Sequence, residues 1–168
     1  GRRWRGSTLL ATAVLSLMML SRSLRGAERL SPDLADAGRV TGLRRRVPDS
    51  TLGDYLARVA PAALRRHLHA QILAEQRRKA LEPTVLPLRA LAVDGKNVAT
   101  LATAAHPDCQ RQAPPGQDPY WVYRVVNATL ISAAAGVCVD QQAIPAATND
   151  AGVFPAFYAA LTRTYGRA

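Results

Sequence analysis

The spacing of apolar residues along the chain changes at about residue 83. Before that point, apolar residues recur every three or four positions, as in Leu52, Leu56 and Val59, and this spacing is typical of one face of a helix. Pro61 suits the first turn of a further helix. The sequence predicts helices over residues 8–24, 32–37, 51–59 and 61–80. The first is apolar nearly all round, which predicts burial between other elements.

After residue 83 the apolar residues form short runs separated by turn residues, which is typical of strands. The sequence predicts strands over residues 88–93, 97–101, 120–131 and 136–144, and a last helix over 153–165. Asn149 or Asp150 is expected to cap that helix. The order of elements predicts an α+β chain with a helical N-terminal region, residues 1–82, and a mixed sheet with helices packed on it, residues 83–168.

Asp94 is the most informative single residue, because it follows the apolar run 88–93 and precedes Gly95 and Lys96. A carboxylate at the end of a buried strand can hold a divalent metal ion against a phosphate backbone. Asp-Gly after alternating apolar residues is also a strong signal for a β-hairpin turn. The residues alone leave both interpretations open.

The net charge of +10 is concentrated in the first hundred residues. Residues 1–50 hold 10 Lys and Arg against 4 Asp and Glu, and residues 51–100 hold 8 against 4. Such an excess favours contact with a polyanion, most often nucleic acid. The densest cluster is Arg44, Arg45 and Arg46, which we predict to contact DNA. An arginine-rich and alanine-rich composition can also reflect a genome of high G+C content.

The two cysteines, Cys109 and Cys138, are too few for a disulfide framework or a four-cysteine zinc site. Neither the His67 and His69 pair nor the pair of His106 and Cys109 has the further ligands of a structural zinc site. We expect a reducing, cytoplasmic location and no membrane partner, since the apolar run 8–20 is too short to span a bilayer.

The opening segment also has the outline of a signal peptide, because three arginines precede that apolar run. A secreted basic protein is therefore an alternative. The first residue is Gly rather than Met, and the predicted last helix ends at the end of the chain, so we expect the chain to be part of something longer.

Three segments in this order resemble the DDE-type transposases of bacterial insertion sequences. Residues 46–52 are similar to the start of the helical region that precedes the catalytic domain in that family. Residues 91–96 resemble its first catalytic strand, and residues 144–150 resemble a later segment that usually reads Thr-Asn-Glu before a helix. The family's catalytic domain resembles ribonuclease H, so the resemblance implies an incomplete RNase H-like sheet.

The resemblance implies a metal-dependent activity, the cleavage and transfer of DNA strands with Mg²⁺ or Mn²⁺. Asp94 would be a catalytic metal ligand, and Lys96 would lie beside the scissile phosphate. Two metal ions need further acids, and no residue here matches the family's second aspartate or its glutamate, so we expect this chain to be inactive. The alternative is a non-catalytic basic module that binds DNA. We also expect self-association through an unpaired sheet edge.

Overall fold

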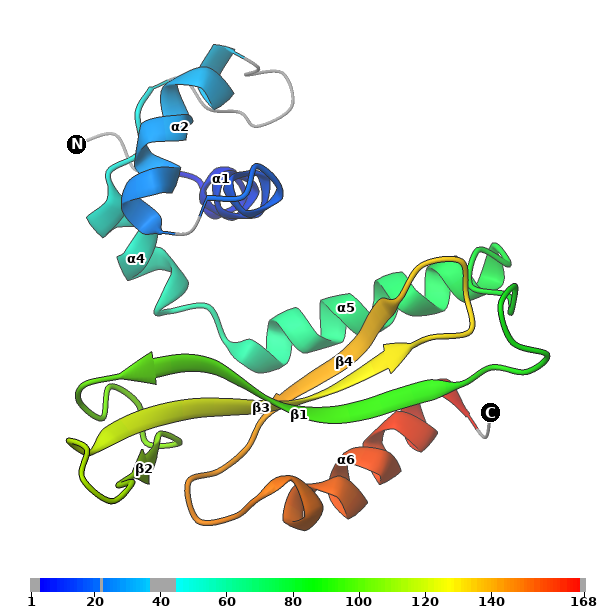
Figure 1. Ribbon diagram of the computed structural model, residues 1–168. Helices are drawn as coiled ribbons and strands as arrows, with labels where there is room; N and C mark the ends of the chain where they lie inside the picture. Colours follow the sequence, from blue (N-terminus) through cyan, green and yellow to red (C-terminus); the bar gives the residue numbers. More distant parts are fainter. Residues whose placement is uncertain (1–3, 22, 37–44, 167–168) are drawn as a thin grey trace. The chain divides into compact units, whose positions relative to one another are not determined.

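The computed structural model describes residues 4–21, 23–36 and 45–166 (Figure 1). The chain consists of two compact units, Gly1–Pro61 and Ala62–Ala168. From the sequence we expect the boundary between the helical region and the sheet region after residue 82. In the structure, the long helix that starts at Pro61 packs against the sheet and is part of the second unit.

The described part of the first unit consists of three helices, α1 (Gly6–Met18), α2 (Leu24–Asp36) and α4 (Asp49–Leu56). Their buried apolar side chains form a small core of Leu9, Ala27, Leu34, Val47 and Leu52. The inward side of α1 also carries Thr8, Thr12 and Ser16, whereas Leu17 and Met18 are largely exposed. Helix α1 is therefore buried along one side, whereas we expected burial between other elements. None of the described helices has the length and apolar character needed to cross a bilayer.

Helix α1 ends six residues before the predicted end at residue 24. The backbone N–H of Ser21 donates to the carbonyl of Ser16, and that of Leu20 donates to Leu17. This pattern is a Schellman motif, in which the turning residue adopts a left-handed conformation. Leu20 is that residue, with φ of 60°, and the chain then turns into α2.

The second unit contains an open antiparallel sheet whose middle strand is β3 (Tyr120–Leu130). Strand β1 (Leu91–Leu101) pairs with one edge of β3. The short β2 (Gln110–Gln112) and the longer β4 (Val137–Ala143) pair with successive parts of its other edge. The α+β class is confirmed. Every pairing among the described strands is antiparallel, whereas we expected a mixed sheet.

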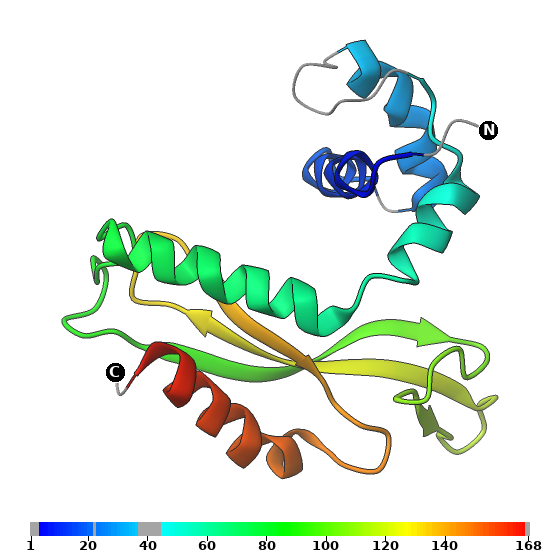
Figure 2. The same ribbon diagram turned by 180° about the vertical axis from the view of Figure 1, so that it is seen from behind.

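Helices α5 (Pro61–Arg77) and α6 (Asp150–Tyr165) pack on the same face of this sheet, as both views show (Figures 1 and 2). Ile72 of α5 and Phe157 of α6 join one core with Val126 and Ala128 of β3. Alternation along β3 places these two valine and alanine side chains on the helix-covered face. Among the described residues of the second unit, no helix packs on the opposite face.

The predicted hairpin at Asp94 and Gly95 is wrong, because both residues lie inside the continuous strand β1. Asp94 lies opposite Asn127 and Gly95 lies opposite Val126 in the ladder with β3. Pairing with a strand some thirty residues away overrides the local turn preference. The irregularity that does occur is a bulge between Asn97 and Ala99.

Candidate functional site

Asp94 occupies an exposed position on the outermost strand of the sheet. Its neighbours Val93 and Gly95 face α6, since Val93 packs against the core and Gly95 contacts the Asp150 side chain. Successive side chains of a strand point to opposite faces. The Asp94 carboxylate therefore projects from the face of the sheet opposite to α5 and α6.

Polar side chains accompany Asp94 on that face. Lys96 is exposed two residues further along β1, and Asn127 is the register partner of Asp94 on β3. The side-chain oxygen Oδ1 of Asn127 is buried and has no hydrogen-bond partner among the described residues. The strand register thus brings together one carboxylate, one amide and one ammonium group.

These residues do not fit a Mg²⁺ site by themselves. Mg²⁺ keeps most of its water unless several oxygen ligands, usually carboxylates or phosphates, replace it. The part of the chain that the structure describes holds no group of three His, Cys, Asp or Glu side chains able to bind a metal ion. No step that requires a bound metal can therefore be assigned to this arrangement.

A second carboxylate, Asp150, lies on the helix-covered side of β1. It begins α6, and its Oδ1 lies 2.6 Å from Nη2 of Arg124 on β3. The preceding residue, Asn149, caps α6 because its side-chain oxygen accepts a hydrogen bond from the Gly152 N–H, as we predicted. A cavity of about 160 Å³ here is lined by Val93, Asp94, Gly95, Val126, Asp150, Ala151 and Phe154.

Gly95 is required at this close approach. A Cβ built on Gly95 would overlap the Asp150 carboxylate, so any larger residue displaces the start of α6. This packing gives the Asp-Gly pair a structural role that differs from a turn. Asp94 and Asp150 both line the cavity of about 160 Å³, but alternation along β1 directs the Asp94 side chain to the opposite face of the sheet. The two carboxylates are therefore not directed toward one ion.

Asp140 on β4 is a fully buried acid, and the sequence predicts no contact for it. Arg65 of α5 donates from Nε to Asp140 Oδ1 at 2.7 Å and from Nη2 to Oδ2 at 2.6 Å. Its Nη1 donates to Gln142 Oε1 at 3.2 Å. Arg65 and Asp140 are 75 residues apart in the sequence, so no local pattern could have revealed the pair.

Two more groups complete this buried cluster. His69 Nε2 lies 3.1 Å from Asp140 Oδ1, and the Tyr165 hydroxyl donates to the Val139 carbonyl at 2.7 Å. Burial raises the pKa of the Asp140 carboxyl, but Arg65 and then His69 outweigh it and hold the pKa below its ordinary value. Burial, followed by the nearby charge of Asp140, raises the pKa of Tyr165 to about 12. The contacts of this cluster connect α5 and α6 to β4.

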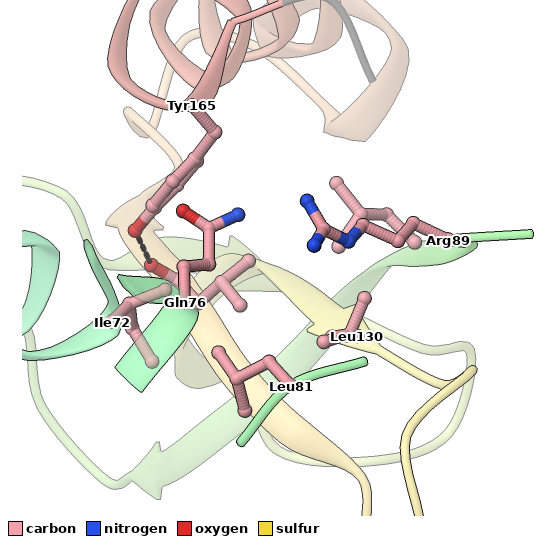
Figure 3. A pocket seen from close by; sticks show the side chains of 8 residues that line it. Ile72, Gln76, Leu81, Arg89, Leu130 and Tyr165 are labelled. Atoms are coloured by element: carbon pink, nitrogen blue, oxygen red, sulfur yellow. Dashed lines mark hydrogen bonds between the residues drawn. The ribbon is translucent and has the colours of Figure 1, made fainter. Parts of the chain in front are cut away.

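A small apolar cavity of about 90 Å³ lies between α5, α6 and the sheet. Its lining residues are Ile72, Gln76, Leu81, Arg89, Leu91, Leu130, Val139 and Tyr165. Figure 3 shows the Gln76 amide and the Arg89 guanidinium turned toward each other across the opening. Because Arg89 pairs with Glu82 at 2.8 Å, its charge is already compensated, and the cavity is an incompletely filled end of the core.

The predicted DNA-contacting arginines lie in the first unit. Arg44 falls outside the described residues. The Arg45 guanidinium lies over the Trp4 ring, 4.5 Å from its centroid, and Arg46 pairs with Glu28 at 2.7 Å. The Arg46 side chain is still 64% exposed, so its charge remains accessible to solvent.

Comparison with known proteins identifies no relative, because no family model, no curated protein and no solved structure matches the chain.

Proposed function

We propose that residues 1–168 form the helical region and the first part of an RNase H-like catalytic domain of a DDE-type DNA transposase. On this proposal the chain contacts DNA in the cytoplasm and does not cleave it by itself. The segments in residues 46–52, 91–96 and 144–150 carry the resemblance.

One structural observation carries the proposal further. The strand that contains Asp94 is followed by three strands, the short β2 and the longer β3 and β4, in an antiparallel arrangement, and then by a helix packed on the same sheet. An RNase H-like sheet begins with antiparallel neighbours, and the resemblance matches its first helix to residues 153–165. Strand β1 also has an unpaired outer edge among the described strands, where a larger sheet would continue.

The chemistry of the described residues supports binding and argues against cleavage. A two-metal reaction needs several acids to hold the ions that activate the attacking oxygen and stabilise the leaving oxygen. Among the described strands, no second acid lies on the face of the sheet from which Asp94 projects. The Lys96 ammonium is exposed beside it and can neutralise a phosphate without a metal ion.

A plasmid assay tests the claim of inactivity. Supercoiled DNA is incubated with the chain and Mg²⁺ or Mn²⁺, and the topological forms are separated on a gel. We expect no nicking or strand transfer above the protein-free control, and the same result for Asp94→Asn. Cleavage that the wild-type chain performs and Asp94→Asn loses would overturn the claim that this chain is inactive.

The second candidate is a non-catalytic DNA-binding module, favoured by the exposed Arg66, Arg77 and Lys79 of α5 and the segment after it. Alanine substitutions at Arg44, Arg45 and Arg46 that abolish binding, together with an unchanged affinity for Asp94→Asn and Lys96→Ala, support this candidate. Loss of affinity in Lys96→Ala supports contact near Asp94 instead.

A further inference from the structure

We propose that the outer edge of β1 is an interaction surface for a second copy of this chain, which adds its own β1 in the antiparallel direction. The two copies would be related by a two-fold axis that passes near Gly95. This proposal rests on the shape and charge of the edge. It assigns to a second copy the same edge at which, on the proposed function, a larger sheet would continue.

The backbone of the edge is available for pairing. Strand β1 is 11 residues long and pairs with β3 alone among the described strands. Residues 91–101 make no other backbone hydrogen bond within the described part of the chain. A long edge strand of this kind presents a row of N–H and C=O groups that another strand can bind.

Apolar side chains next to the edge are exposed in the same region. Leu91 is 40% exposed, Phe154 44% and Tyr158 57%. The rings of Phe154 and Tyr158 stack on each other with centroids 5.8 Å apart, and Phe154 lines the cavity beside Val93 and Gly95. Figures 1 and 2 show α6 running alongside β1. A second copy would bring its own α6 to the same face and cover these rings.

The charges on β1 favour a second copy of the chain as the binding partner of this edge. An edge lysine normally discourages pairing with another strand, but here Asp94 lies two residues from Lys96 on the same face of the strand. In an antiparallel pair centred on Gly95, Asp94 of each copy lies opposite Lys96 of the other. Opposite charges in such cross-strand positions are attractive. The edge is thus electrostatically complementary to itself.

The proposal is tested by measuring mass with light scattering after size-exclusion chromatography, over a range of protein concentrations. We expect a dimer for the wild-type chain. Asp94→Lys places lysines opposite lysines, and Lys96→Asp places aspartates opposite aspartates. Each variant alone is expected to weaken dimerisation roughly tenfold or more, since two attractive pairs become repulsive.

Mixing the two variants provides the decisive measurement. In a dimer of Asp94→Lys with Lys96→Asp, both cross-strand pairs are again of opposite charge, so an equimolar mixture is expected to dimerise where neither variant does alone. The matched control is Arg111→Asp, a charge reversal at an exposed residue of β2, which is expected to leave the dimer intact. Circular dichroism confirms that each variant is folded.

Three outcomes overturn the proposal. If the wild-type chain stays monomeric at all concentrations, the edge of β1 does not bind a second copy. A dimer that persists in both single variants uses a different surface. A mixture that stays monomeric, although the wild-type chain dimerises, shows that Asp94 and Lys96 do not face each other across the interface.

Discussion

Arg65 on α5 binds both carboxylate oxygens of Asp140, a fully buried residue of β4. The Arg65 side chain is 27% exposed and that of Asp140 is not exposed at all. The geometry is bidentate, which is the strongest arrangement for an arginine and a carboxylate. This pair connects the long helix to strand β4 of the sheet.

Removal of Arg65 is expected to destabilise the second unit severely. Arg65→Ala leaves the Asp140 charge buried without its main partner, and the loss of a partner from a buried pair costs about 3–5 kcal/mol. Urea unfolding followed by Trp121 fluorescence in a Trp4→Phe background reports on this unit. Arg66→Ala changes the exposed neighbour and is expected to shift the free energy of unfolding by about 0.5 kcal/mol or less.

The difference in the free energy of unfolding between the wild-type chain and Arg65→Ala is expected to depend on pH. In the wild-type chain the pKa of Asp140 is lowered, so its stabilising contribution is present above the ordinary carboxyl pKa and is lost as the pH falls. Without Arg65, burial favours the protonated acid. The gap between wild type and Arg65→Ala is therefore expected to narrow on acidification. A gap that is independent of pH would contradict this explanation.

Tyr165 is expected to give the chain an alkaline pH dependence. Its pKa is raised to about 12, whereas an unfolded tyrosine ionises near 10. The stabilisation is fully present below pH 10 and is lost as the pH rises through the folded-state pKa.

Tyr165→Phe removes this dependence and the hydrogen bond to Val139, at a cost of about 0.5–1.5 kcal/mol at neutral pH. The comparison is made by urea unfolding between about pH 9 and 11, a range chosen around the tyrosine pKa. Tyr158→Phe, at an exposed position, is the control and is expected to follow the wild type. Parallel curves for wild type and Tyr165→Phe above pH 10 would show that Tyr165 does not contribute.

Gly95→Ala is expected to destabilise the second unit by about 1–3 kcal/mol, a typical cost of overpacking. The added Cβ would overlap the Asp150 carboxylate and disturb the ion pair with Arg124. In an Asp150→Ala background the same substitution should cost much less, and a double-mutant cycle measures that coupling. Gly136→Ala is the control, since its nearest neighbour would be Thr129 Cγ2 at an ordinary 3.6 Å. Additive effects of the two substitutions would exclude the clash.

Lys79→Gly is expected to stabilise the chain. Lys79 has φ of 60° at the end of α5, and the Ala80 N–H donates to the Glu75 carbonyl, as in a Schellman motif. Glycine adopts this left-handed conformation without strain. The relief of backbone strain is expected to exceed the free-energy cost of glycine's larger entropy in the unfolded state by about 0.5 kcal/mol. Thermal unfolding compares it with Lys79→Ala, which keeps the Cβ and should show no gain. An equal gain in both variants would point to the loss of charge instead.

Local patterns predicted most of the elements and few of the contacts. Asn149 caps the last helix as predicted, and the strand over 120–131 differs from β3 by one residue, because both depend on neighbouring residues. The hairpin prediction at Asp94 is wrong because a distant strand supplies the hydrogen bonds of β1. Strand β2 was missed, since three residues inside a proline-rich loop carry no periodic signal.

The candidate site was only partly predictable for the same reason. The motif at 91–96 predicts a role for Asp94 and Lys96. Only the strand register shows that Asn127 lies beside Asp94. The direction in which Asp94 points depends on which face of the sheet the helices cover. The contacts that engage Arg45 with Trp4 and Arg46 with Glu28 also depend on tertiary packing.

DNA binding as a function of salt concentration tests the central claim most directly. A fluorescently labelled DNA duplex is titrated with the chain in the presence of Mg²⁺, and strand integrity is checked in the same samples. We expect intact DNA and an affinity that falls by roughly tenfold or more between about 50 and 200 mM salt, because phosphate contacts release counterions. Absence of binding at the lowest salt concentration, or an affinity that does not change with salt, would contradict the account.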